Sequence, residues 1–125
     1  MMRRWVGWGL GAASCVSAGT PDEFATSLAE AQCDQLERCL LGLYEATFSS
    51  EEDCISDTTD EIDGANDAYT EADCTFQPDE AADCVRRVRG LDCDEIVQGR
   101  DQQACDLVWS CEDPYVTLPT NREER

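Results

Sequence analysis

The sequence predicts an all-α fold, a small disulfide-rich bundle of about four helices closed by four disulfides. Apolar residues recur at helical spacing through most of residues 23–112. Nine cysteines in 125 residues, with no C-x-x-C pair and no histidine, indicate a disulfide framework in an oxidising compartment and not a zinc module. Large apolar residues are otherwise sparse, so a core of this size needs covalent links to be stable.

Capping signals divide the chain into helices. Thr20 is the predicted N-cap of the first helix, and Pro21 its first residue. A capping box is predicted at 49–52, Pro78 opens a third helix, and Gly90 ends it. The predicted segments are a first helix over 22–48, a second up to 69, a loop at 74–77, a third helix over 78–90, a short helical turn over 92–98 closed by a glycine, and a fourth helix over 101–111.

Each predicted helix has one apolar face that we expect to point inward. The inward residues of the third helix are Ala81, Cys84, Val85 and Val88, and those of the fourth are Ala104, Cys105 and Val108. Trp109 lies among the cysteines of the fourth helix, where we expect it to pack in the core or against a disulfide.

Eight cysteines of the folded part are predicted to form the disulfides. They are Cys33, Cys39, Cys54, Cys74, Cys84, Cys93, Cys105 and Cys111. Cys33 and Cys39 are separated by about 9 Å along a helix axis, whereas bonded cysteines have Cα atoms within about 7 Å. These two cysteines must therefore bond to different elements.

Eight cysteines allow on the order of a hundred pairings, and sequence alone cannot select one. A hairpin of the first two helices would bring Cys39 near Cys54. A completion of that pattern joins Cys93 to Cys105, Cys74 to Cys84, and Cys33 to Cys111.

The first residues have the pattern of an export signal. Arg3 and Arg4 form a short positive region, and the apolar stretch WVGWGLGAA follows over residues 5–13. This stretch is too short for a hydrocarbon core that needs about 20 residues. We therefore predict a signal peptide of the lipoprotein type at 1–14, a tether at 15–22, the helical domain at 23–112 and an extended tail at 113–125.

Two cleavage sites fit this leader. In the first, Ala12-Ala13-Ser14 before Cys15 resembles the bacterial lipoprotein signal, and the resemblance implies that Cys15 becomes the lipid-bearing N-terminus. In the second, cleavage follows Ala18 and discards Cys15. Both leave eight cysteines that can pair, so the odd count does not choose between them. We favour lipid attachment at Cys15 because this cysteine directly follows small residues after the apolar stretch.

The chain is strongly acidic. Once Arg3 and Arg4 are removed with the leader, seven arginines face 28 acidic residues, which gives a net charge of −21. Such a charge repels phosphates and anionic lipid head groups, so we expect no nucleic-acid partner. We expect the acids to form a solvated surface.

The layout resembles the small cysteine-rich lipoproteins of myxobacteria, a family without an assigned function. The stretches that carry the resemblance are FATSLAEAQCDQLERC, FSSEEDC, CTFQPDEAADCVRRVRGLDCDEI and ACDLVWSC, within residues 24–111. The resemblance implies an envelope-attached helical domain held at the membrane by its N-terminal lipid. It implies no activity.

The residue types present exclude several chemistries. Without histidine and lysine, the chain has no Ser-His-Asp or Cys-His arrangement and no Schiff-base amine. Paired carboxylates can run glycoside hydrolysis, but no apolar cleft that would raise one pKa is evident in the sequence. We therefore predict no enzyme, no catalytic residue and no cofactor, with a carboxylate-based hydrolase as a distant alternative.

Calcium is a weak alternative. The acidic run over 57–67 fails as an EF-hand, because alignment of Gly64 to the loop glycine places Thr59 and Thr70 where acids are required. We predict no metal ligands. Arg86, Arg87 and Arg89 form a positive cluster near a helix C-terminus, where dipole compensation and surface pairing explain them.

The sequence therefore predicts a non-enzymatic, lipid-anchored module of the outer membrane or periplasm that serves interaction or structure, with an unknown protein partner. A freely secreted effector or inhibitor is the alternative if cleavage follows Ala18. A cell-surface location fits either prediction.

Overall fold

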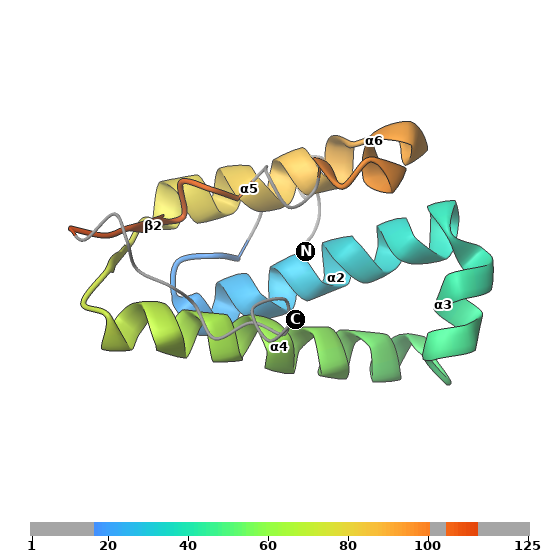
Figure 1. Ribbon diagram of the computed structural model, residues 1–125, viewed down its shortest axis with the longest axis horizontal. Coiled ribbons are helices and arrows are strands. Elements are labelled where there is room, and N and C mark those ends of the chain that lie inside the picture. Colours follow the sequence, from blue (N-terminus) through green and yellow to red (C-terminus); the bar gives the residue numbers. More distant parts are fainter. Residues whose placement is uncertain (1–16, 101–104, 113–125) are drawn as a thin grey trace, which may run out of the picture.

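One long helix contacts every other helix in the part of the protein that the structure describes. A computed structural model describes residues 17–100 and 105–112. The elements, in chain order, are α2 (Pro21–Cys39), α3 (Leu41–Thr47), α4 (Glu51–Glu71), β1 (Thr75–Phe76), α5 (Pro78–Gly90), α6 (Cys93–Val97) and β2 (Trp109–Ser110). Helix α2 packs on α3, α4, α5 and α6, and it lies between α4 and α5 (Figure 1). The predicted all-α, disulfide-rich class is confirmed.

Helix α2 begins as its capping residues predict. The Thr20 hydroxyl accepts a hydrogen bond from the Glu23 amide at 3.2 Å, and Pro21 occupies the first turn. The helix does not run on to residue 48, because the backbone of Leu40 leaves the helical conformation (φ −137°, ψ 52°) and separates α2 from α3. This break turns α3 across the end of the bundle, so that Tyr44 is buried against Cys33 and Cys54 (Figure 1).

The predicted bounds of α5 are confirmed, and α4 extends two residues past its predicted end. Ser50 caps α4 by accepting from the Asp53 amide at 3.1 Å. The short helical turn is also confirmed as α6, where Asp92 and Glu95 form a capping box and Gly99 follows with φ +80°.

The prediction of a fourth helix is wrong over residues 105–111. These residues form a turn and then β2, which pairs antiparallel with β1 in the segment predicted as a loop. The Gln77 amide donates to the Val108 carbonyl at 2.7 Å and extends the pairing. Val108 is buried, as predicted, but it reaches the core from the end of a turn; Ala104 lies outside the described residues.

All eight predicted cysteines are paired, but none of the four expected pairings is correct. The disulfides join Cys33 to Cys54, Cys39 to Cys93, Cys74 to Cys111, and Cys84 to Cys105. The break at Leu40 is one cause of the different pairing. Because α3 occupies the connection between α2 and α4, Cys33 lies opposite Cys54. The strand register is another, since Thr75 faces Ser110 and the next pair outward is Cys74 and Cys111.

The core divides into two clusters. The larger lies among α2, α5 and the β2 turn and is built mostly of alanine and valine, with Phe24 and Leu28 as its large members. The smaller surrounds the Cys33–Cys54 disulfide. Ala18 is only 3% exposed within the larger cluster, so the packed domain includes residues from the predicted tether, before the expected boundary at residue 23.

The Cys39–Cys93 disulfide closes a long loop, and its removal tests the framework. In the chain-entropy model, a link between residues 54 apart lowers the free energy of the folded state relative to the unfolded chain by about 4 kcal/mol. We expect the double variant Cys39→Ala/Cys93→Ala to lose about this much unfolding free energy in urea denaturation. An unchanged midpoint would show that this link does not hold α6 to α2.

Candidate functional site

An apolar groove lies at the end of the bundle where α2, α4 and α6 meet. Its volume is about 510 Å³. The apolar side chains that line it are Leu36, Leu40, Phe48, Val88, Ile96 and Val97. Cys33 and Cys54 also line the groove. The disulfide between them joins α2 to α4. This site follows from packing between helices distant in sequence, and it was not predicted.

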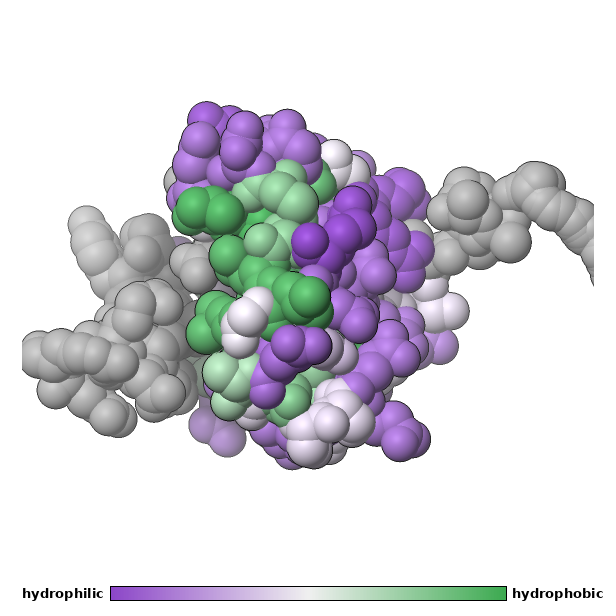
Figure 2. Space-filling model, turned by 90° about the vertical axis from the view of Figure 1, so that its right-hand side faces the viewer, coloured by the Kyte–Doolittle hydropathy of each residue, from purple (hydrophilic) through white to green (hydrophobic). Residues whose placement is uncertain are grey.

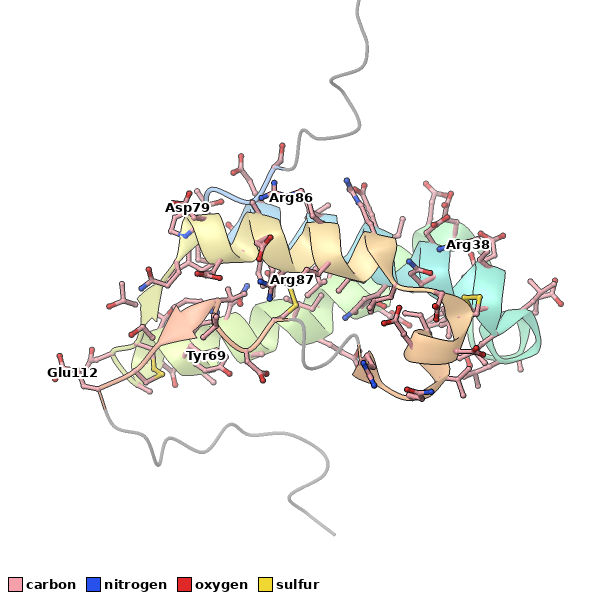
Figure 3. The ribbon with its side chains drawn as sticks, turned by 90° about the horizontal axis from the view of Figure 1, so that it is seen from above. Arg38, Tyr69, Asp79, Arg86, Arg87 and Glu112 are labelled. Carbon is pink, nitrogen blue, oxygen red and sulfur yellow. A yellow bond between two sulfur atoms is a disulfide. The ribbon has the colours of Figure 1, made fainter. Side chains whose placement is uncertain are left out.

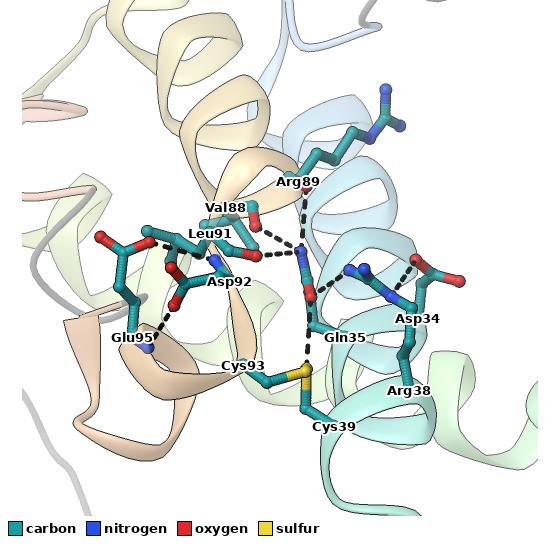
Figure 4. Close-up of a disulfide and its surroundings, with 10 residues drawn as sticks. All are labelled: Asp34, Gln35, Arg38, Cys39, Val88, Arg89, Leu91, Asp92, Cys93 and Glu95. Carbon is teal, nitrogen blue, oxygen red and sulfur yellow. Dashed lines mark hydrogen bonds and ion pairs between the residues drawn. A yellow bond between two sulfur atoms is a disulfide. The ribbon is translucent and has the colours of Figure 1, made fainter.

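The buried amide of Gln35 forms one wall of the groove and holds α5 against α2. Gln35 is 2% exposed, and its Nε2 donates to the carbonyls of Val88 at 2.8 Å and Arg89 at 3.0 Å (Figure 4). These carbonyls belong to the last turn of α5, where the helix supplies few amide partners; that of Val88 also accepts from the Leu91 amide at 3.3 Å. Gln35 thus caps α5 from a neighbouring helix.

The other side of the Gln35 amide faces outward. Its Oε1 accepts from Arg38, which also lies 3.9 Å from Asp34 in an exposed pair (Figure 4). Close by, the Cys39–Cys93 disulfide ties the end of α2 to α6. Helical spacing offered a signal for Gln35, since it lies seven residues after Leu28 and four after Ala31 on the apolar face of α2.

A second buried amide, Asn66, joins three elements at the opposite end. Its Nδ2 donates to the Pro21 carbonyl at 3.0 Å, and its Oδ1 accepts from the Trp109 indole at 3.3 Å. Trp109 stacks on Tyr69 with ring centroids 5.2 Å apart (Tyr69 is labelled in Figure 3). Burial, and then the charge of Asp106, raises the pKa of Tyr69. The expected core role of Trp109 is confirmed.

The arginine cluster of α5 does not form a single site. Arg86 and Arg87 leave α5 in different directions (Figure 3), and Arg87 pairs with Asp83 at 2.6 Å. Arg89 borders a shallow hollow whose other charged members are Asp22, Glu23 and Glu30. The cluster is therefore dispersed into surface pairing at the end of the helix, as predicted.

Acidic side chains concentrate on α4, and one of them, Glu61, lines the groove. The run over 57–67 is continuous helix within α4, which agrees with a solvated face and not with a calcium loop. Partial desolvation, and then repulsion from Asp22, Asp67 and Asp60, raises the pKa of Asp63. Over residues 17–100 and 105–112, no three histidine, cysteine, aspartate or glutamate side chains are grouped so as to hold a metal.

The predicted lipid site at Cys15 lies outside the described residues. Within the described part, no helix combines the length and the apolar character needed to cross a bilayer. No family model, curated protein or solved structure matches the chain. Function must therefore be argued from the residues and their geometry.

Gln35→Met tests whether the buried amide caps α5. Methionine keeps most of the side-chain volume but cannot donate to the carbonyls of Val88 and Arg89, so we expect a loss of about 1–3 kcal/mol in unfolding free energy. Gln32→Met, one turn earlier on the same helix and half-buried, is the control and should change little. Equal stability of the two variants in urea denaturation would contradict the capping role.

Asp63→Asn tests the repulsion on α4. A raised pKa in the folded state means that the protein is most stable while Asp63 is protonated and loses stability as the pH rises through that pKa. The variant should therefore melt up to about 3 °C higher than the parent at pH 7, with the difference vanishing near pH 3. Asp57→Asn, an exposed acid on the same helix, should show no such pH-dependent gain.

Proposed function

We propose that this protein is an exported envelope module, anchored by a lipid on Cys15, that acts through binding or structure and not through catalysis. Its four disulfides fit an oxidising extracellular or periplasmic compartment. Eight cysteines are used within the domain, so the ninth, Cys15, is left for another role. Lipid attachment is the role that its position after a short apolar leader favours.

The observation that carries the anchor is the packing of the residues just before α2. Ala18 is 3% exposed in the larger core cluster. The hydroxyl of Ser27, itself 7% exposed, donates to the Ser17 carbonyl at 2.6 Å. Cleavage after Ala18 would remove both partners, emptying part of the core and leaving a buried hydroxyl without its acceptor, at about 1–3 kcal/mol. Cleavage before Cys15 keeps both.

Anchoring at Cys15 would hold the domain close to the membrane. Three peptide units separate Cys15 from the buried Ala18, and a chain of that length spans at most about 10 Å. The acidic domain is repelled by anionic head groups, so it would stand on the bilayer with its α2 N-terminal end nearest the lipid. The groove, at the other end of α2, would then face away from the membrane.

The site geometry favours binding over catalysis. The groove offers apolar side chains and a buried amide that is already engaged in capping α5. Asp63, whose pKa is raised, lies among other acids on α4 and is not a member of the groove lining. A carboxylate hydrolase would need such a group inside an apolar cleft.

The mature N-terminus tests the proposal. Intact mass spectrometry of protein from its natural host should show a chain that starts at a lipidated Cys15 and gains eight hydrogens on reduction of the four disulfides. Cys15→Ser should move the protein from the membrane fraction to the soluble fraction. An unmodified chain that starts at Gly19 would overturn the anchor and establish the secreted effector or inhibitor instead.

A further inference from the structure

We infer that the groove end of the bundle docks a positively charged amphipathic helix of a protein partner. The proposal deepens the binding role proposed above and rests on it. It depends on three properties of one end of the molecule, namely an apolar groove, exposed apolar side chains beside it, and an acidic rim around both.

Exposed apolar side chains gather at this end. Four large apolar residues are exposed in the described part of the chain, and three of them lie here: Leu41 at 49% and Leu43 at 56% in α3, and Val97 at 65% in α6. Leu40, which immediately precedes Leu41, lines the groove, as does Val97 itself. Figure 2, a view of this end, shows apolar residues gathered in its middle with hydrophilic residues above and to one side. Contiguous exposure of this kind marks interaction surfaces.

The rim of the apolar area is acidic. Glu61 lines the groove itself. Beyond Phe48, a shallower hollow is bordered by Glu37, Glu45 and Glu51. Partial desolvation, and then the charges of Glu37 and Glu51, raises the pKa of Tyr44 at the centre of that hollow. A cationic partner would complement the negative charge of these acids, since potentials across an interface are complementary.

Two arginines lie at the same end of the bundle, but they do not outweigh the negative charge of its acids. Arg38 is held by Gln35 and Asp34. Arg100 follows Gly99, which lines the groove, and its side chain is exposed. A second copy of this chain would bring a second acidic rim against the first. Like charges across an interface are costly, so a basic partner fits the surface better than self-association.

The walls of the groove favour a helical partner over an extended one. Residues from α2, α4, α5 and α6 line it, and the backbone groups of helices are already hydrogen-bonded within them. An extended peptide needs a strand edge that supplies backbone partners, whereas a helix satisfies its own backbone and presents an apolar face. The groove can receive such a face while the acids on the rim meet lysine or arginine on its flanks.

The test uses the disulfide-bonded protein and a short peptide of leucine and lysine only, ordered so that a helix has one apolar face. Fluorescence anisotropy at physiological salt should show this peptide binding at least about ten times more tightly than one of the same composition with leucines spread around the helix. The scrambled peptide carries the same charge, so equal binding of the two would mean attraction to an acidic surface and would overturn the proposal.

Variants then locate the surface. Leu43→Asn/Val97→Asn should weaken binding about tenfold, because two contact side chains lose their apolar surface. Leu107→Asn is the matched control, since Leu107 is 61% exposed in the turn before β2, and binding should change by less than about twofold. All three side chains are exposed, so circular dichroism should show the fold intact. If the two variants weakened peptide binding to a similar degree, the groove end of the bundle would not be the binding surface.

The charge of the rim has its own control. Glu61→Gln should weaken binding and reduce its dependence on salt, whereas Glu71→Gln, at the C-terminal end of α4 and outside the groove lining, should do neither. Two outcomes would overturn the proposal. A dimer that forms without peptide and that Leu43→Asn/Val97→Asn disrupts would indicate self-association. Binding of an uncharged fluorescent monoglyceride that depends on Val97 would indicate a lipid ligand. These measurements do not use the Cys15 anchor, so their failure leaves that part of the proposed function standing.

Discussion

The double attachment of α2, by Cys33 to α4 and by Cys39 to α6, is the constraint on which the rest of the structure depends. Helices α4 and α5 both pack on α2, so its position sets theirs. The larger core is built mostly of small residues and supplies limited hydrophobic stabilisation. The net charge of −19 adds self-repulsion to the compact state. Disulfides offset both by restricting the unfolded chain.

Two buried amides complete what the disulfides begin. Gln35 ties the last turn of α5 to the C-terminal part of α2, and Asn66 ties α4 to the first residue of α2 and to Trp109. Each is itself buried and finds hydrogen-bond partners in a neighbouring element. Covalent links fix which helices are neighbours, whereas these hydrogen bonds fix how the helices are aligned along one another.

The two ends of α2 have different chemistry. At its N-terminal end, Ser17 and Ala18 are part of the packed domain, so the chain is already ordered where the proposed anchor would begin. At its C-terminal end, roughly 20 Å further along the helix, the groove combines apolar side chains with an acidic rim. An anchored protein with this layout would present its binding surface away from the bilayer. The helix α2 would thus relate the proposed attachment to the proposed recognition.

The sequence by itself determined the features that depend on local physics. Thr20, Pro21 and Pro78 set the helix starts, Asp92 with Glu95 set the short turn, and the cysteine content set the covalent character of the core. Tertiary structure decided the rest. The break at Leu40, the strand at 109–110 and the four pairings depend on contacts between distant segments, which helical periodicity does not contain. The groove depends on the same contacts, because its walls come from four helices whose juxtaposition only the folded chain creates.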